Sequence, residues 1–496
     1  MTGRLYPFAK VLIANRGEIA CRIARTLRER GIGVVAVHHA VERHAAHVRA
    51  ADEAVELVGD TPVAAHLDIK QIVSAALATG AQAIHPGYGF LSENARFAAA
   101  VKEAGLVFIG PDPETIRLMG DKISARNFAS AQGVPVAPSV MATGDLEAFR
   151  AEAAAIGFPL LIKAAAGGGG KGMSIVRSAA DLAEAVRRAA SEAQRYFGDG
   201  RIYAETYVER PRHIEVQVAG DGEGRAIHLF ERECSVQRRF QKIVEEAPAA
   251  SLAPALRDQI CGEAVRLASA SRYRNLGTVE FILGENGRFF FLEMNTRLQV
   301  EHPVTEMIAG LDLVGLQLDI AAGFGLGLSQ SDVRIKGHAI EVRVCAEDPE
   351  RDFLPETGVV SALAVPSAPY LRFENALELG QKVTADFDPM LAKLVAHGAN
   401  REQAIERLIA ALRELTLLGV KTNIDYLARV IAHPAFRHAD LHTGFVKEHA
   451  ATLQAQPLPA ELRIAALAAA ATGFREFRDL AFGAPEPYAS IGPWRN

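Results

Sequence analysis

Strand-like segments alternate with helical ones through the first 110 residues, and this alternation constrains the fold more than any other feature. Four segments have the apolar character of buried strands: residues 10–14, 34–38, 81–85 and 106–109. Between the first two, Ile19, Ile23 and Leu27 give a helix its apolar face at a spacing of four residues. Because strands that alternate with helices form parallel sheets, we predict an α/β unit of the doubly wound kind.

The middle of the chain has a different pattern, in which neighbouring strands pair as hairpins. Glycine-containing turns at residues 220–224 and 284–287 separate strand-like segments. A proline-rich connection at residues 133–138 indicates a hinge before them. From Gly337 a third region begins, with an amphipathic helix at residues 401–416. We therefore expect α+β structure after the first unit.

Length and charge limit the class of protein. At 496 residues, two to four domains are expected, and 49% hydrophobic with 23% charged residues is ordinary for a globular enzyme. A net charge of −5 gives no argument for a nucleic-acid or membrane partner. The four cysteines form no CxxC pair, and no apolar run reaches membrane-spanning length. These features favour a cytoplasmic location.

Polar residues at alternate positions follow an apolar strand at residues 289–292. They are Glu293, Asn295, Arg297, Gln299 and Glu301. In an extended chain, every second side chain points to the same face, so these five are expected to line one surface. Hard oxygen ligands beside an arginine indicate a metal site next to an anion site. A solvent-facing strand is the alternative.

Glu280 lies in the middle of the preceding strand of the same hairpin. A carboxylate there is costly unless it is paired or binds a metal. Together with Glu293 and Asn295 it offers two carboxylates and an amide oxygen, a set that suits Mg²⁺. The alternative is that Glu280 pairs with an arginine.

A glycine loop at residues 164–173 lies between two predicted strands. Lys163 precedes the loop and Lys171 lies within it. Small residues let backbone N–H groups surround phosphate oxygens, while the lysines balance their charge. The loop is no Walker A motif, because Lys171 is followed by Gly172 rather than Ser or Thr. We predict a phosphate site; a flexible linker is the alternative.

Three other segments carry weaker signals. The turn around Tyr88 follows a strand at its carboxyl end, where open sheets bind ligands, but it also suits a packed tight turn. The strand end from Glu205 to Val208 can offer backbone groups to a purine, although an ordinary edge strand fits it better. The charged segment 231–246 includes four residues able to hold an anion, or to form a solvated face: Gln237, Arg238, Arg239 and Lys242.

Together these motifs resemble those of the biotin carboxylases, the ATP-grasp component of biotin-dependent carboxylases such as acetyl-CoA and other acyl-CoA carboxylases. The resemblance covers roughly residues 8–447. Its motifs are residues 13–20 (IANRGEIA), 85–94 (HPGYGFLSEN), 117–122 (RLMGDK), 167–173 (GGGGKGM), 211–213 (PRH), 234–246 (CSVQRRFQKIVEE), 293–306 (EMNTRLQVEHPVTE), 341–343 (EVR) and 353–355 (FLP).

The resemblance implies a Rossmann-like N-terminal domain at residues 1–118 and an ATP-grasp domain at 119–330 with a mobile lid at about 135–203. It implies a C-terminal α+β domain at 335–447, and residues 448–496 as a tail or the start of a linker domain. It also implies a ligase that forms a C–N bond: ATP and bicarbonate give carboxyphosphate, whose carbon dioxide carboxylates N1 of biotin. This is the first half-reaction of acyl-CoA carboxylation, as in fatty acid biosynthesis.

The resemblance also implies roles for individual residues. The ATP contacts are Lys122, Lys163, His213, Gln237, the adenine-side pair Glu205 and Val208, and the loop residues Gly168, Gly169, Gly170, Lys171, Gly172 and Met173. The metal ligands for Mg²⁺ or Mn²⁺ are Glu280, Glu293 and Asn295. The bicarbonate contacts are Lys242, Arg297, Gln299 and the backbone of Val300. Glu301 is implied as general base, Arg343 as the group that stabilises the biotin enolate, and Tyr88 as a neighbour of biotin.

Two observations bear on partners and activity. No methionine is followed by lysine, so the Ala-Met-Lys-Met turn of a biotin carrier is missing from this sequence. We therefore expect biotin on a carrier protein or domain, with a carboxyltransferase subunit as a further partner and a homodimer as the family's oligomeric state. Phe240 departs from the histidine usual in the family. Another ATP-grasp ligase with an acyl-phosphate intermediate, or an inactive ATP-binding scaffold, remains an alternative.

Overall fold

The computed structural model describes residues 5–142, 146–164, 173–197, 200–455 and 459–468. The chain divides into a compact unit, residues 1–453, and a short second unit, residues 454–496, in which residues 460–468 are helical. Residues 165–172 of the predicted phosphate loop, including Lys171, lie outside the described residues. Among the helices described, none combines the length and the apolar character needed to cross a bilayer.

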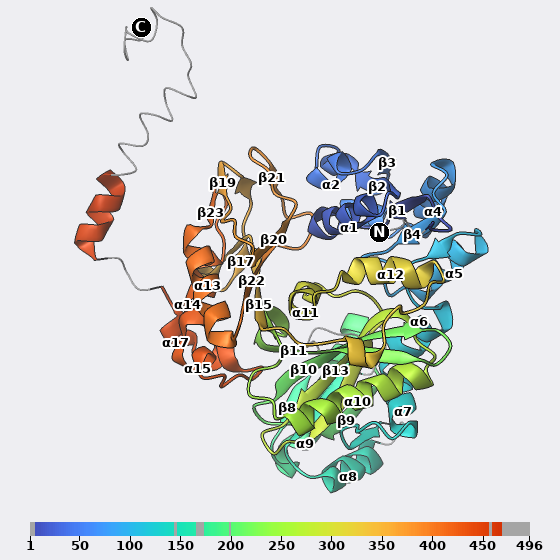
Figure 1. The fold of residues 1–496 in the computed structure, drawn as a ribbon. Coiled ribbons are helices and arrows are strands. Elements are labelled where there is room, and N and C mark those ends of the chain that lie inside the picture. Colours follow the sequence, from blue (N-terminus) through green and yellow to red (C-terminus); the bar gives the residue numbers. More distant parts are fainter. Residues whose placement is uncertain (1–4, 143–145, 165–172, 198–199, 456–458, 469–496) are drawn as a thin grey trace, which may run out of the picture. The chain divides into compact units, whose positions relative to one another are not determined.

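A five-stranded parallel sheet opens the compact unit, as the alternation of strands and helices predicts (Figure 1). Its strand order is β3-β2-β1-β4-β5. The strands are β1 (Lys10–Ile13), β2 (Gly33–His39), β3 (Glu53–Leu57), β4 (Ala83–His85) and β5 (Val107–Phe108). The helices around it are α1 (Gly17–Glu29), α2 (Ala46–Arg49), α3 (Pro62–His66), α4 (Ile69–Ala78) and α5 (Ala95–Glu103), with the 3₁₀ turn η1 (Ala40–Glu42). The next two helices, α6 (Pro113–Gly120) and α7 (Lys122–Ala131), pack against strand β14 (Phe289–Asn295) of the second sheet.

The side chains of β1 show why this sheet is covered on both faces. Val11 and Ile13 join the core under α1, whereas Leu12 points to the opposite core, which α4 and α5 complete. The first face is also covered by α12 (Leu313–Ala321), which comes from much later in the sequence and packs against α1. The fold of the N-terminal region therefore depends on a helix that its own sequence does not contain.

An eight-stranded sheet, order β14-β13-β10-β11-β12-β15-β22-β20, forms the middle of the unit. Its strands are β10 (Arg212–Asp221), β11 (Ala226–Arg238), β12 (Gln241–Ala247), β13 (Arg274–Leu283), β14 (Phe289–Asn295), β15 (His338–Cys345), β20 (Leu371–Asn375) and β22 (Met390–Gly398). All of their pairings are antiparallel. Since β12 pairs with β15, three strands of the third region extend the same sheet.

A smaller four-stranded sheet, order β6-β9-β7-β8, lies in the predicted lid segment. Its elements are β6 (Ser139–Met141), α8 (Leu146–Ile156), β7 (Leu160–Ala164), β8 (Ser174–Val176), α9 (Ala179–Phe197) and β9 (Ile202–Thr206). The strands β7 and β8, which flank the glycine loop, pair antiparallel. Phe149, Leu182 and Val186 pack with this sheet in a core of their own.

Helices and short strands complete the unit. Those of the middle region are α10 (Pro254–Ala270), α11 (His302–Ala309) and the 3₁₀ turn η2 (Gln330–Asp332). Those of the third region are β16 (Glu347–Asp348), η3 (Pro349–Arg351), β17 (Leu354–Pro355), β18 (Gly358–Val359), β19 (Ala362–Ala364), β21 (Lys382–Val383), α13 (Arg401–Glu414), β23 (Thr416–Leu418), α14 (Ile424–Ala432), α15 (Pro434–Arg437), α16 (Phe445–Glu448) and α17 (Ala450–Leu453). The predicted fold class, α/β with α+β, is confirmed.

The expectation that residues 293–301 stay extended is only partly right. Strand β14 ends at Asn295, and the chain then turns into α11, which begins at His302 with Pro303 in its first turn. A proline there has its φ already set for a helix and lacks only an N–H that the helix cannot use. Arg297, Gln299 and Glu301 are therefore placed by the turn, not by strand alternation.

Candidate active site

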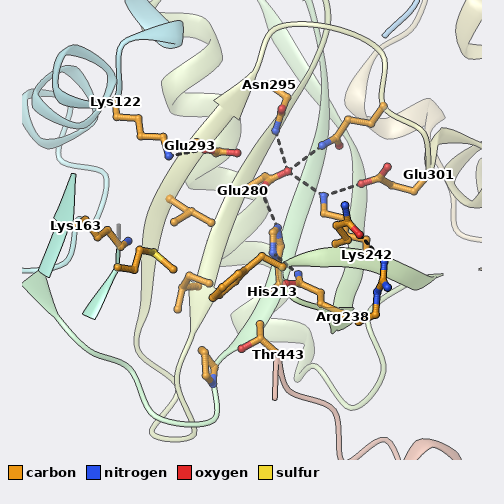
Figure 2. A pocket seen from close by; sticks show the side chains of 18 of the residues that line it. Lys122, Lys163, His213, Arg238, Lys242, Glu280, Glu293, Asn295, Glu301 and Thr443 are labelled. Carbon is orange, nitrogen blue, oxygen red and sulfur yellow. Dashed lines mark hydrogen bonds and ion pairs between the residues drawn. The ribbon is translucent and has the colours of Figure 1, made fainter. Parts of the chain in front are cut away.

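One cavity of about 820 Å³ brings together the predicted site residues that the structure describes. It lies against the eight-stranded sheet and reaches the small sheet at β7 and β9 (Figure 2). Its walls include Tyr88, Lys122, Lys163, Met173, Glu205, Val208, His213, Gln237, Lys242, Glu280, Glu293, Asn295, Arg297, Gln299, Val300, Glu301 and Arg343. Gly168 to Gly172 lie outside the described residues. Arg238 also lines the cavity, whereas Arg239 points outward to Asp352.

Glu280 and Glu293 face each other across the hairpin of β13 and β14. Burial and then the negative charge of Glu280 raise the pKa of Glu293, while Lys122, whose Nζ lies 3.9 Å from its carboxylate, opposes the rise. Asn295 donates from Nδ2 to Oε1 of Glu280 at 2.8 Å. A divalent cation between the two carboxylates would remove their repulsion, so this donor set fits Mg²⁺.

Lys242 connects the carboxylate pair to the predicted general base. Its ammonium lies 3.0 Å from Glu280, 2.7 Å from Glu301 and 2.5 Å from Glu215, and Figure 2 shows it between Glu280 and Glu301. Burial lowers the pKa of Lys242, but these carboxylates outweigh burial and raise it well above its ordinary value. The lysine is therefore a permanent cation at the centre of the cavity wall.

Glu301 is held between two cations. Oε1 faces Lys242, and Oε2 lies 3.0 Å from the guanidinium of Arg343. Burial favours the protonated acid, yet Lys242, Arg343 and Arg232 together hold the pKa of Glu301 well below its usual range. The carboxylate of Glu301 is therefore ionised, and it bridges the side chains of Lys242 and Arg343.

On its other side, Arg343 is bound by Glu245. Nε of Arg343 donates to Glu245 Oε1 at 2.6 Å. Burial, opposed by Arg343, raises the pKa of Glu245 to about 7. The guanidinium of Arg343 is thus fixed in direction by one carboxylate while it faces another, Glu301.

Arg297 and Gln299 lie in the turn between β14 and α11. Nε of Arg297 donates to the carboxylate of Glu93 at 2.9 Å, and a second guanidinium nitrogen donates to Asn295. A planar guanidinium that already faces a carboxylate is suited to a planar anion such as bicarbonate. Gln299 donates to Glu280 at 2.9 Å and so links the turn to the metal-type ligands.

The other predicted nucleotide contacts lie on the small sheet and beside Glu280. Lys163 on β7 forms an ion pair with Glu205 on β9. Gln237 donates to Nδ1 of His213 at 3.0 Å, which leaves Nε2 of the ring facing Glu280 at 2.9 Å. Phe240, at the tip of the hairpin between β11 and β12, lines the cavity and is 59% exposed.

Sequence reasoning missed Arg232, which organises the wall from behind. Its side chain is fully buried on β11. It donates to acceptors on two other strands of the sheet and on the turn and helix that follow β14: Glu215, Gln217, Thr278, Gln299 and Thr305. Arg232 belongs to the charged segment 231–246, which the sequence singles out. A buried arginine cannot be distinguished from an exposed one in sequence before the register of the strands is known.

The chain matches three family descriptions in sequence order. "Biotin carboxylase, N-terminal domain" matches residues 7–116, "Carbamoyl-phosphate synthase L chain, ATP binding domain" matches residues 121–329, and "Biotin carboxylase C-terminal domain" matches residues 341–448.

Curated relatives are similar over most of the chain. Biotin carboxylase 2 of Bacillus subtilis is 49% identical over 444 residues, which is 89% of this chain and 100% of that protein. The mitochondrial methylcrotonoyl-CoA carboxylase subunit alpha of Mus musculus is 46% identical over 442 residues. The match covers 89% of this chain but only 62% of the mouse protein.

Solved structures agree with these relatives. The biotin carboxylase domain dimer of 2-oxoglutarate carboxylase from Hydrogenobacter thermophilus, in complex with MgADP, ADP and bicarbonate, superposes with a TM-score of 0.87 at 43% identity, covering 92% of this chain and all of that one. A biotin carboxylase complex from Campylobacter jejuni has a TM-score of 0.86 at 40% identity, with 89% and 99% covered. The family resemblance stated from the sequence is confirmed: this chain belongs to the biotin carboxylases, the ATP-grasp enzymes that carboxylate biotin.

Proposed function

We propose that this chain uses ATP and bicarbonate to carboxylate biotin that a separate carrier protein or domain presents. The observation that carries the proposal is the position of Glu301 between Lys242 and Arg343, on a cavity that also holds the Glu280–Glu293 pair. A general base, two cations and a metal-type ligand set within one cavity match a reaction that joins two anions.

Glu301 is proposed to remove the proton of bicarbonate, because bicarbonate is a poor nucleophile before it loses that proton. While Lys242 and Arg343 both face Glu301, its pKa is low and it is a weak base. An anion in the cavity competes for the same cations. As they turn toward that anion, burial raises the pKa of Glu301 and makes the carboxylate a stronger base.

The deprotonated bicarbonate oxygen then attacks the γ-phosphorus of ATP, and the bond from phosphorus to the ADP oxygen breaks. In this proposal Arg297 and Gln299 orient the bicarbonate plane, with Lys242 and the backbone of Val300 beside it. Lys122 and Lys163 neutralise phosphate charge, and His213 contacts the nucleotide. Mg²⁺ or Mn²⁺ held by Glu280, Glu293 and Asn295 would supply positive charge to the phosphate oxygens.

Carboxyphosphate releases carbon dioxide and phosphate; the released phosphate takes the proton from N1 of biotin, and N1 attacks the carbon dioxide. Arg343 is proposed to stabilise the negative charge that develops on the ureido oxygen of biotin, near Tyr88. The fixed direction of Arg343, set by Glu245, means that little reorganisation is needed when that charge appears.

Partners and location belong to the same proposal. A biotin carrier must reach the cavity, a carboxyltransferase must use the carboxybiotin, and a homodimer is proposed because a related biotin carboxylase domain was solved as a dimer. The four free cysteines support a reducing, cytoplasmic compartment, although the mouse relative is mitochondrial. The final carboxyl acceptor is set by the partner.

The test is ADP release with free biotin, with and without bicarbonate. We expect release to depend on both, and to fall about 10²- to 10⁴-fold in Glu301→Gln, since the variant lacks the base. Arg343→Ser should lose the biotin dependence. Matched controls are Glu414→Gln and Arg413→Ser, exposed on α13, which should behave as wild type.

Two outcomes would contradict the proposal. If neither Glu301→Gln nor Arg343→Ser changed ADP release, the base and the enolate contact would be wrongly assigned. If ATP bound to the wild type without turnover, the inactive scaffold would be the better description, and release with an amine acceptor in place of biotin would favour another ATP-grasp ligase.

A further inference from the structure

Lys393 is a fully buried lysine that the reaction above does not use. It lies on β22, directly opposite Arg343 on β15. Two cations opposite each other in a sheet repel, so each needs its own acceptor. Glu245 and Glu301 provide that for Arg343, and a different set of groups provides it for Lys393.

The first acceptor of Lys393 is the carbonyl of Val300. Nζ donates to this oxygen at 2.7 Å. The carbonyl belongs to the peptide unit that joins Val300 to Glu301, so the ammonium fixes the plane of the peptide immediately before the general base. No regular strand or helix holds this turn, because β14 ends at Asn295 and α11 begins at His302.

The second acceptor is Glu18, in the first turn of α1. Nζ of Lys393 lies 3.1 Å from Glu18 Oε1, and the hydroxyl of Tyr88 donates to the same oxygen. The ammonium is also 5.8 Å from the centre of the Tyr88 ring, within reach of a cation–π attraction. Glu18 belongs to the Asn-Arg-Gly-Glu motif of residues 15–18, for which the mechanism gives no other role.

We propose that Lys393 is a positioning residue for biotin carboxylation: it fixes the Val300–Glu301 peptide at the bicarbonate end and, through Glu18, the Tyr88 ring at the biotin end. The inference rests on the proposed function. One ammonium thereby ties together a strand of the large sheet, the first helix of the parallel sheet and the catalytic turn. Neither the general base nor Tyr88 is held by its own element alone.

The test compares three full-length variants, because Lys393→Met alone leaves Glu18 buried without its cation and risks misfolding. Glu18→Gln and the double variant Lys393→Met/Glu18→Gln differ only in the lysine once the acid is neutral. We expect kcat/KM for bicarbonate, measured by ADP release, to be about tenfold or more lower in the double variant than in Glu18→Gln, since a buried hydrogen bond from a charged donor is lost.

A purely structural role predicts another result. If Lys393 served only to neutralise Glu18, the double variant would match Glu18→Gln in kcat/KM for bicarbonate, and the positioning role would be overturned. Binding of ADP, measured by calorimetry, should change by less than about twofold between the two variants, because a single hydrogen bond to Val300 lies away from the nucleotide contacts. A parallel loss of ADP binding would show general damage and would also overturn the role.

The biotin end has its own readout. Glu18→Gln should raise KM for free biotin about threefold or more, because the Tyr88 hydroxyl loses a charged acceptor. An unchanged KM would overturn the part of the inference that concerns Tyr88. For the Lys393→Met change, the matched control is Lys382→Met, at an exposed lysine on β21. Wild-type enzyme without bicarbonate- and biotin-dependent ADP release would instead contradict the proposed function, which separates the two failures.

Discussion

Phe240 is one of the residues of the cavity wall that differ from the family pattern in the resemblance stated from the sequence. It lies at a hairpin tip with a left-handed backbone, φ +67°. Histidine, the residue usual at this place in the resemblance, is among the side chains that tolerate such a conformation. The exposed ring has an apolar surface and no group that forms a conventional hydrogen bond.

Replacing Phe240 with histidine should therefore improve nucleotide binding without changing the chemistry. We expect Phe240→His to lower KM for ATP about threefold to tenfold, the contribution of one net hydrogen bond, with kcat little altered. Phe240→Leu, which stays apolar, should give no gain. Steady-state ADP release at varied ATP checks this, and an unaltered KM in Phe240→His would show that the tip does not reach the nucleotide.

Glu293 gives a second prediction at the same scale, on metal binding. Its repulsion with Glu280 destabilises the metal-free chain, so Glu293→Gln should raise the melting temperature without metal. The same change removes a charged ligand and should weaken Mg²⁺ binding about tenfold or more.

Thermal unfolding with and without Mg²⁺ measures both effects on one sample. The exposed Glu103→Gln on α5 is the control for charge alone. A metal-free variant less stable than wild type, or an unchanged response to Mg²⁺, would contradict the assignment of Glu293 as a ligand.

At the scale of elements, three connections pack around one buried acid. Glu42 ends η1, forms an ion pair with Arg16 after β1 and lies 2.8 Å from Nε2 of His66 at the end of α3. Burial alone would raise the pKa of Glu42, but its hydrogen bond to His66 and the charge of Arg16 lower it to about 2. The contacts of Glu42 with Arg16 and His66 thereby hold together the segments that follow β1, β2 and β3.

Because the pKa of Glu42 is lowered in the folded state, the free energy of unfolding falls at acidic pH. The contribution of Glu42 is complete above its unfolded pKa of about 4.5 and is lost as pH falls from there through about 2. Glu42→Gln should cost about 3 kcal/mol at pH 7 and flatten the fall of the unfolding free energy over that window. Urea unfolding at several pH values tests this; a variant with the wild-type slope would contradict it.

For the whole molecule, the compact unit ends at Leu453, and every described residue of the site lies within it. We expect a chain that ends after Ala455 to fold and to keep kcat and the KM values for bicarbonate and biotin within about twofold, because the core and site residues that the structure describes all lie before that point. ADP release and gel filtration would check this.

A shorter chain that ends at Asp440 is the matched control. It removes Leu441, Phe445 and Leu453 from the core formed by α13 and α14, and should unfold or aggregate. Loss of activity in the chain that ends after Ala455 would show that residues after 455 serve the reaction.

The sequence by itself determined the family, the fold class and a group of residues that the structure brings together on one cavity. Local patterns suffice for these, since the periods of strands and helices appear in short windows and the motif at residues 293–301 lies close in sequence to Glu280. The domain boundaries and the role of each site residue stay predictions.

Only the tertiary structure decided which charges meet. Register across β12, β15 and β22 places Arg343 between Glu245 and Glu301 and sets Lys393 opposite it, where the lysine meets a carboxylate from the first helix of the chain. A buried arginine such as Arg232 reads in sequence like any surface one. Its partners are fixed by strand pairing, which depends on the whole chain and not on its neighbours.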